Sequence, residues 1–316
     1  MPFVGEILRH RSVSIVGLAK NAGKTECLNY IIRRLPVDYF NVAVTSIGID
    51  GETTDQVTGT AKPEITVREG MFFATSEKHF RQKRPLSELY DVSEEDTALG
   101  RTVTAKALQE GKVLLSGPSS ASALKRWMSS LKVFGIDLIL IDGALSRLST
   151  ASPAVSEAMV LSTGAAYSAN IRELVSRTAF VVELIRLPVY AGPEPSLRVS
   201  SFSSLDAGVL KGHRVIEVEG ALTDRLLQMA KNGPGDGELE LVVGDFTRIF
   251  CSQELYRAFL RRGGLISVRM KSELIAVCVN PVAPNGIVLD SDILCSELSQ
   301  KIGLPVYDIV KNEYEV

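Results

Sequence analysis

Short apolar runs alternate with segments of helical periodicity along most of the chain, and this alternation predicts an α/β protein. Residues 12–18 form an apolar, β-branched run typical of a buried strand. Residues 23–35 carry apolar side chains at helical spacing, and Pro36 ends that pattern. Residues 41–48 predict the next strand. Because strand, helix and strand follow one another so closely, we expect a βαβ unit with parallel pairing.

The same rhythm continues toward the C-terminus with two interruptions. Residues 50–100 are polar and irregular, and a connection of that length predicts a functional segment or small local strands. Residues 187–208 are rich in Pro, Ser and Gly and mark a domain boundary. Further strands are predicted at 111–120, 135–147, 157–168, 179–185, 214–220, 238–245, 265–270, 273–281 and 304–310, and further helices at 121–133, 222–231, 252–262 and 291–302.

Composition narrows the classes of protein to which the chain can belong. The 316 residues are 45% hydrophobic and 23% charged, and the formal net charge is −2. This balance is typical of a globular protein and does not favour nucleic acid or an anionic membrane surface as a partner. The four cysteines lack metal-ligand spacing, and the first residues lack a signal-peptide pattern. We therefore expect a soluble cytoplasmic protein, with Cys27 more easily explained as a buried residue than as a catalytic one.

The segment "GLAKNAGKT" lies between the first predicted strand and the first predicted helix. In the usual P-loop pattern a glycine lies six residues before the lysine, whereas here Leu18 occupies that position and Gly17 precedes it. A loop that opens a helix points backbone N–H groups at one spot, which suits a phosphate. Lys24 is expected to reach the β- and γ-phosphates, and the Thr25 hydroxyl to bind Mg²⁺. The expected nucleotide-binding residues are Gly17, Lys20, Asn21, Ala22, Gly23, Lys24, Thr25 and Glu26.

Two acidic positions are expected to join this loop at the carboxyl edge of a parallel sheet. Asp142 follows the apolar run 138–141. In P-loop proteins an aspartate at the end of such a strand holds Mg²⁺. Asp50 follows the second predicted strand, with Glu52 and Asp55 nearby. Asp50 is the candidate for metal binding and for orienting a water, so Lys24 and Asp50 are the expected catalytic residues. A solvated polar turn remains an equal alternative for each acid of this cluster.

Other residues offer weaker signals. Asn280 ends an apolar strand before Pro281 and can present its amide to a purine edge, although an Asn-Pro turn explains it equally well. Arg147 can add a charge near the phosphates, with a solvent-facing role as the default. The chain has no G-x-S-x-G elbow, no evident partners for its three histidines, and no G-x-G-x-x-G string. Nucleophilic Ser-His or Cys-His catalysis is therefore not expected.

"GLAKNAGKT" resembles the loop of the dethiobiotin synthetase-type P-loop enzymes, a group related to signal-recognition GTPases, division-site-selecting ATPases and metallochaperone NTPases. This resemblance implies a parallel sheet, ATP or GTP, and Mg²⁺, with Lys24, Thr25 and Asp142 at the family positions and Asn280 at the base. A narrower likeness, in "TSIGIDGE", "IDGALSR" and "VNPVAPNG", is to the ATPase subunit of a bacterial lysine aminomutase reactivase. It implies ATP-driven exchange of damaged cobalamin on a partner enzyme.

The chain also departs from these relatives. Ala19 occupies the position of the signature lysine that the dimerising ATPases carry, and Lys20 is one place away. Dethiobiotin synthetase has a lysine after the second strand, whereas this chain has none there. This difference argues against the dethiobiotin synthetase reaction. The absence of an Asn-Lys-x-Asp string favours ATP over GTP.

The fold class expected from these observations is α/β, with a mostly parallel sheet and helices on both faces, similar to P-loop NTPases. Residues 1–190 are expected to form the nucleotide-binding domain, and residues 191–316 a second α/β domain or a continuation of the same sheet. The expected function is ATP hydrolysis with Mg²⁺ that changes the conformation of a protein partner. A small-molecule kinase or ligase and a non-hydrolysing nucleotide sensor remain alternatives, and a homodimer is left open.

Overall fold

The computed structural model describes residues 2–47, 64–82, 85–97, 99–144, 152–199, 210, 212–232 and 239–311. These residues divide into two compact units. The first unit holds the described residues up to 144, residues 155–178 and residues from 274 onward, and the second holds 152–154 and 179–273. Among the described residues, no helix is both long and apolar enough to cross a membrane.

The first unit is built on a nine-stranded sheet in the order β17-β16-β9-β1-β8-β2-β4-β6-β5. Its strands are β1 (Ser12–Gly17), β2 (Val42–Ser46), β4 (Phe72–Ser76), β5 (Ser87–Val92), β6 (Thr102–Ala107), β8 (Leu138–Ala144), β9 (Ala158–Gly164), β16 (Glu273–Asn280) and β17 (Val306–Asp308). Strands β3 (Ile65–Val67) and β7 (Gly111–Val113) form a separate antiparallel pair. The helices are α1 (Pro2–Ile7), α2 (Lys24–Arg34), α3 (Glu77–Gln82), α4 (Ala121–Ser130), the 3₁₀ turn η1 (Leu131–Phe134), α5 (Ile171–Ile185), whose last part belongs to the second unit, and α8 (Ser291–Ile302).

The sheet is mostly parallel. β1 pairs in parallel with β8 and β9, and β2 pairs in parallel with β8 and β4. Toward this edge β6 reverses direction, since it runs antiparallel to both β4 and β5, and β5 therefore points the same way as β4. β8 therefore lies between β1 and β2 and brings its carboxyl end between theirs, which is the edge where parallel sheets bind ligands.

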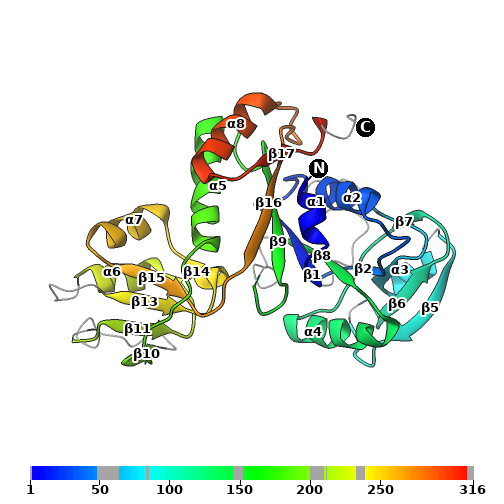
Figure 1. Ribbon diagram of the computed structural model, residues 1–316, viewed down its shortest axis with the longest axis horizontal. Helices are drawn as coiled ribbons and strands as arrows, with labels where there is room; N and C mark the ends of the chain where they lie inside the picture. The colour runs from blue at the N-terminus through cyan, green and yellow to red at the C-terminus, as the bar shows by residue number, and fades with distance from the viewer. Residues whose placement is uncertain are drawn as a thin grey trace. The chain divides into compact units, whose positions relative to one another are not determined.

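Alternate residues of the central strands enter two different hydrophobic cores, because successive side chains of a strand point to opposite faces of the sheet. Leu138 and Leu140 of β8 pack in the same core as Leu28 and Ile31 of α2. The neighbouring positions, such as Ile139 and Ile141 of β8, pack in the second core with Leu124 and Trp127 of α4. Helices α2 and α4 thus cover opposite faces of the sheet, as Figure 1 shows. Each fully buried aliphatic side chain contributes about 1.5–3 kcal/mol to this packing.

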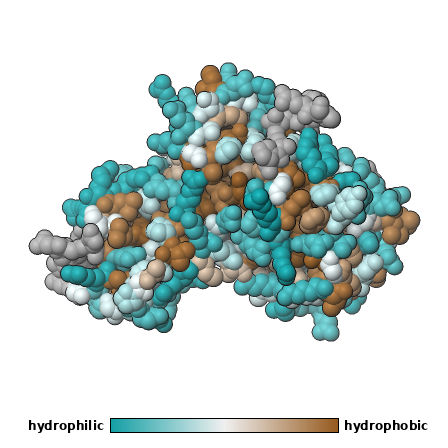
Figure 2. Space-filling model, in the orientation of Figure 1, coloured by the Kyte–Doolittle hydropathy of each residue, from teal (hydrophilic) through white to brown (hydrophobic). Residues whose placement is uncertain are grey.

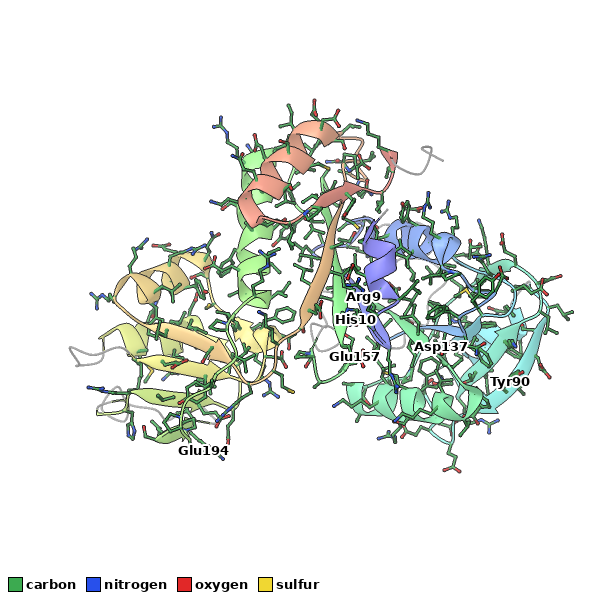
Figure 3. All side chains as sticks on the ribbon, viewed as in Figure 1. Arg9, His10, Tyr90, Asp137, Glu157 and Glu194 are labelled. Atoms are coloured by element: carbon green, nitrogen blue, oxygen red, sulfur yellow. The ribbon has the colours of Figure 1, made fainter. Side chains whose placement is uncertain are left out.

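Polar side chains secure the amino-terminal edge of the sheet. Glu157, just before β9, accepts a hydrogen bond from the Arg11 N–H at 2.7 Å, and Figure 3 labels it beside the segment that carries Arg9 and His10. Asp137, just before β8, accepts one from the Asn41 N–H at 2.9 Å. These bonds fix where the strands begin, and they leave the opposite, carboxyl edge to the loops described below.

The second unit is a smaller parallel α/β structure. Its sheet has the order β10-β11-β13-β15, formed by β10 (Leu197–Val199), β11 (Val215–Val218), β13 (Glu240–Val243) and β15 (Leu265–Val268). The remaining elements are the parallel pair β12 (Leu222–Thr223) and β14 (Ile249–Phe250), the helices α6 (Asp224–Asn232) and α7 (Gln253–Arg261), and the 3₁₀ turn η4 (Phe246–Arg248). The helices α6 and α7 pack against each other.

One face of the second sheet carries an ion-pair network. Arg269 donates two hydrogen bonds of 2.9 Å each to Glu217, and Arg198 lies 3.2 Å from the same carboxylate. The hydrogen bond from Arg269 holds the pKa of the Glu217 carboxyl below its ordinary value. The network therefore joins β11 to the end of β15, across β13.

The observed architecture confirms an α/β fold with a large, mostly parallel sheet, but it differs from the expectation in two places. Residues 179–185 were expected to form a strand and are instead the last part of α5, because the apolar run continues a helical spacing through Leu174, Thr178 and Val182. The chain also divides elsewhere than at residue 190. Residues 274–309 return to the first sheet as β16, α8 and β17, whereas 179–273 fold as the second unit.

The polar segment 50–100 is only partly described. Residues 48–63, 83–84 and 98 lie outside the described residues. The rest of the segment forms β3, β4, helix α3 and β5, and β6 begins just beyond it. The expectation of small local strands is therefore confirmed for the described part.

Figure 2 shows that the visible face of the molecule is mainly hydrophilic with smaller hydrophobic groups, as is usual for a folded domain surface.

Candidate functional site

The candidate site lies at the carboxyl edge of the large sheet, where β1 leads into α2. β1 ends at Gly17, and the loop from Leu18 to Gly23 joins it to the helix. The dihedral angle φ is +63° at Asn21 and +84° at Gly23, so both residues adopt the left-handed conformation. Turns of this kind direct backbone N–H groups toward a common point and form concave sites for anions.

The first turn of α2 has no side-chain cap. Helices α4, α7 and α8 each begin at a Ser or Asp whose side chain accepts a hydrogen bond from a backbone N–H of the helix. Gly23 occupies that position in α2 and forms no such bond. Since the first N–H groups of any helix have no partner within it, those of α2 can bind an external anion, which the helix dipole also favours.

Gly23 is required by the close approach of Asn280, the last residue of β16. A Cβ atom on Gly23 would lie 2.7 Å from the Asn280 Cβ, which is shorter than real contacts of this kind. Gly164, at the end of β9, is required for the same reason, since a Cβ there would lie 2.0 Å from the Asn280 carbonyl oxygen. The Asn280 side chain is oriented by Val282, whose N–H donates to Oδ1 at 3.0 Å. Asn280 is therefore held against the loop, with its Nδ2 facing Gly23.

Lys24 and Asp142 form an ion pair at the centre of the site. The distance between Lys24 Nζ and Asp142 Oδ1 is 2.9 Å, and the two side chains are 24% and 19% exposed. Apart from this contact, Oδ1 has no hydrogen-bond partner among the described residues. Solvent screens such a half-buried pair less than a surface pair. The sequence predicted both residues for one site, and the structure brings them together.

The position of Asp142 follows from the strand order. β8 is in register with both of its neighbours, so Asp142 lies beside Ile15 of β1 and Ser46 of β2. Its side chain therefore emerges next to the loop that follows β1. A carboxylate at this position can form an ion pair with a lysine or coordinate a metal ion that is bound to phosphate.

Ser162 of β9 supports the loop, and the sequence analysis did not identify it. The Ser162 hydroxyl donates a hydrogen bond to the Ala22 carbonyl at 2.9 Å, and the Leu18 N–H donates to the Ser162 carbonyl at 2.8 Å. Both ends of the loop are thus attached to β9. The only signal in the sequence was the place of this serine near the end of the strand predicted at 157–168.

A second segment lies against the end of β2. The Gly117 N–H donates to the Ser46 hydroxyl at 3.2 Å, and a Cβ on Gly117 would lie 1.7 Å from the Ser46 carbonyl oxygen. Beside it, Ser116 Oγ and His79 Nδ1 are hydrogen-bonded at 2.7 Å, and both side chains are buried. The sequence indicated no partner for His79. Because Ser46 is in register with Asp142, this segment adjoins the candidate site.

Cys27 has a structural role in this region. It lies on α2, one turn after Gly23, and both Cys27 and Cys278 of β16 are fully buried. A hydrogen bond with the Cys27 thiol, together with burial, raises the pKa of Cys278 well above its ordinary value. The raised pKa makes the Cys278 thiol a poor nucleophile, and the side chains of Cys27 and Cys278 are buried in the same hydrophobic core, where they pack α2 against β16.

The other predicted site residues have different outcomes. Thr25 is half-buried and follows Lys24, whereas Lys20 and Glu26 are exposed. Asp50, the second predicted catalytic residue, lies outside the described residues, as do Glu52, Asp55 and Arg147. The described part of the chain contains no group of three or more His, Cys, Asp or Glu residues placed to hold a metal ion. A magnesium site that includes Thr25, Asp50 and Asp142 therefore stays a prediction.

The arrangement as a whole combines a concave backbone loop, an uncapped helix end, one lysine and one carboxylate. These are suitable groups for binding a phosphate with an associated cation.

Comparison of the chain with models of known protein families finds no match, and comparison with curated proteins finds no similar protein.

Proposed function

We propose that this protein is a P-loop NTPase that binds ATP with Mg²⁺ and hydrolyses it to change the conformation of a protein partner. The observation that carries the proposal is the pairing of Lys24 with Asp142, 2.9 Å apart, beside a loop that has two left-handed residues. A cationic side chain, a concave backbone and a carboxylate at the end of a parallel strand are the parts that bind a triphosphate and its metal.

The residues of the loop fit a phosphate. The absence of a Cβ at Gly23 lets Asn280 pack against the loop, and the first-turn N–H groups of α2 have no side-chain cap. In the proposed mechanism these N–H groups and Lys24 bind the β- and γ-phosphates and stabilise the negative charge that develops on the transferred phosphoryl group. Lys24 would leave Asp142 for the phosphate, because the two compete for the same ammonium group.

The donor set also fits a magnesium ion. Thr25 offers a hydroxyl and Asp142 a carboxylate, which are the oxygen ligands that Mg²⁺ prefers. When bound, the ion would supply positive charge that offsets the negative charge of the phosphates. Asp50 is proposed to orient the attacking water, on the basis of its place after β2 in the sequence. Asn280, which lies against Gly23, is proposed to contact the nucleotide through its amide.

The partner is proposed from the resemblance of the sequence to aminomutase reactivases, and a cobalamin-dependent enzyme is the candidate. Turnover separates this function from its two alternatives. Release of inorganic phosphate without an acceptor supports the NTPase. Phosphorylation of an acceptor, without phosphate release in its absence, would favour a kinase or ligase. Tight nucleotide binding without turnover would indicate a sensor.

The first test is a thermal-shift titration with ATP and with GTP, each with and without Mg²⁺. A ligand that binds the native state raises the unfolding midpoint by mass action. We expect an increase that depends on Mg²⁺ for the wild type and no increase for Lys24→Ala. The absence of any shift with either nucleotide would overturn the proposal.

A further inference from the structure

Ser46, the last residue of β2, lies beside Asp142 on the same face of the large sheet. The two residues are in register across the parallel pair of β2 and β8. Two residues earlier, Val44 and Leu140 are in register as well, and both belong to the core that α2 covers. Because the side chains of a strand alternate between the two faces, Ser46 and Asp142 also point to the face of α2, the helix that carries Lys24.

The chain after β7 crosses the sheet at this point. Val113 packs in the core on the α2 face, and Leu124 of α4 packs in the core on the opposite face (Figure 1). Between them, the Gly117 N–H donates to the Ser46 hydroxyl at 3.2 Å, and a Cβ on Gly117 would lie 1.7 Å from the Ser46 carbonyl oxygen. The crossing therefore runs directly over the carboxyl end of β2, one strand away from Asp142.

The crossing is anchored before it reaches β2. The Thr75 hydroxyl of β4 donates to the Leu114 carbonyl at 2.7 Å. Ser116 Oγ is hydrogen-bonded to His79 Nδ1 at 2.7 Å, and both side chains are buried. These bonds fix the direction of the Gly117 N–H, and they therefore also fix the orientation of the hydroxyl that accepts from it.

The strand order gives this hydroxyl a place in the proposed site. β16, with Asn280, lies on one side of β1, whereas β8 and β2 lie on the other side. A nucleotide whose base contacts Asn280 and whose phosphates lie at the loop after β1 therefore directs its terminal phosphate toward β8 and β2. Neighbouring strands are about 4.8 Å apart, so Ser46 is the next side chain beyond Asp142 in that direction.

We propose that Ser46 is a further residue of this site and that its hydroxyl positions the water that attacks the terminal phosphoryl group. This inference rests on the proposed function. A hydroxyl has one donor and two acceptor positions. The Gly117 N–H occupies one acceptor position, so the other can accept a hydrogen bond from the water. Asp50, which is proposed to orient the same water, follows Ser46 in the sequence, so both residues come from the chain at the end of β2.

The role of Ser46 is to hold the water and not to react with it. In hydrolysis the water oxygen forms a bond to the γ-phosphorus, the bond from this phosphorus to the β,γ-bridging oxygen breaks, and its electron pair leaves with ADP. One proton of the water is released to solvent, so the products are ADP and inorganic phosphate. Ser46 is half-buried, which allows water to reach it. A displacement of about 1 Å from the reactive position can cost about 100-fold in rate.

The test compares the hydrolysis and the binding of ATP with Mg²⁺ by the whole protein in the wild type and in Ser46→Ala. We expect kcat for phosphate release to fall about tenfold in Ser46→Ala, while KM and the thermal shift with ATP stay unchanged, because the hydroxyl acts on the water and not on the nucleotide. Ser46→Thr keeps a hydroxyl and should restore most of kcat.

Ser87→Ala is the matched control and should leave kcat unchanged. Ser87 is also half-buried and also lies in the large sheet, but it begins β5 at the far edge, where its hydroxyl donates to the Pro85 carbonyl at 3.2 Å.

The outcomes separate this inference from the proposed function. If the wild type hydrolyses ATP and Ser46→Ala has the same kcat, the inference is overturned and the proposed function stands. A Ser46→Thr variant as slow as Ser46→Ala also overturns it, because the hydroxyl would then not be the group responsible. Loss of the thermal shift with ATP in Ser46→Ala overturns it as well, since Ser46 would then support binding. If the wild type binds ATP but releases no phosphate, the inference and the hydrolysis in the proposed function are overturned together.

Discussion

Lys24 Nζ and Asp142 Oδ1 lie 2.9 Å apart, and their ion pair joins the first turn of α2 to the carboxyl end of β8. The two residues are far apart in the sequence and meet because β8 is inserted between β1 and β2. The pair also sets a condition on binding. Any phosphate that Lys24 binds must compete with Asp142, and the carboxylate that is released can then face a cation.

Lys24→Ala is expected to weaken triphosphate binding at least about 100-fold, equivalent to about 2.7 kcal/mol, because charged hydrogen bonds to the phosphates are lost. Isothermal titration with ATP and Mg²⁺ measures the affinity, and circular dichroism shows whether the fold is kept. Lys125→Ala is the matched control, since Lys125 is an exposed lysine on α4. Equal affinity of Lys24→Ala and the wild type would remove the loop from the site.

Asp142→Asn keeps the shape of the side chain and removes its charge. At fixed ATP, we expect the Mg²⁺ concentration at half-saturation to rise about tenfold, or about 1.4 kcal/mol, because the metal loses an anionic ligand. A thermal-shift series with increasing Mg²⁺ measures this midpoint. Asp137→Asn is the control, since Asp137 lies just before β8, at the opposite end of the strand from Asp142. A Mg²⁺ midpoint that Asp142→Asn leaves unchanged would exclude Asp142 as a metal ligand.

The ion pair between Glu217 and Arg269 predicts a pH dependence of stability. Because the pKa of Glu217 is lower in the folded protein than in the unfolded chain, its ionised form stabilises the fold above the unfolded value of about 4.3. That contribution, about 1 kcal/mol for a pair of this exposure, is lost as the pH falls through the lowered pKa. Glu217→Gln cannot ionise and should lose less stability over this acid range than the wild type.

Urea unfolding at neutral pH and at about pH 3.5 measures the difference. Glu240→Gln on the neighbouring strand β13 is the control, since no cation pairs with Glu240 among the described residues. If Glu217→Gln and Glu240→Gln show the same dependence on pH, the network with Arg269 does not stabilise the second unit.

Local patterns in the sequence were sufficient to identify the elements of the candidate site. The alternation of a β-branched run, a loop and a helical spacing predicted β1, the loop and α2, and the apolar run before Asp142 predicted β8. These elements depend on neighbouring residues, so their periodicity is visible in one sequence. The same reasoning failed at 179–185, where an apolar run suits a strand and a buried helix equally well.

The order of the strands could not be predicted in this way. The periodicity near residue 280 predicts a strand but not its partners, so it does not specify that β16 joins the first sheet although the second unit precedes it in the sequence, an arrangement that places Asn280 against Gly23. The support that Ser162 gives to Ala22 depends on the same long-range order. Local periodicity specifies what each segment becomes, whereas the contacts between segments depend on how the strands pair.

The contact between Gly23 and Asn280 leads to the last prediction. Gly23→Ala places a Cβ 2.7 Å from the Asn280 Cβ at a residue whose φ is +84°. The left-handed conformation alone costs a non-glycine residue about 1–2 kcal/mol. The steric overlap adds to this cost and displaces the first turn of α2. We therefore expect Gly23→Ala to lose both stability and nucleotide affinity.

Gly70→Ala separates the two causes. Gly70 has the same φ of +84°, but no atom lies within 4 Å of the position that its Cβ would take. Its substitution should cost only the backbone strain and leave ATP binding unchanged. Urea unfolding compares the stabilities of the two variants, and titration with ATP compares their affinities. If Gly23→Ala costs no more than Gly70→Ala and binds ATP normally, Asn280 does not constrain the loop, and the close approach of β16 to Gly23 has no part in nucleotide binding.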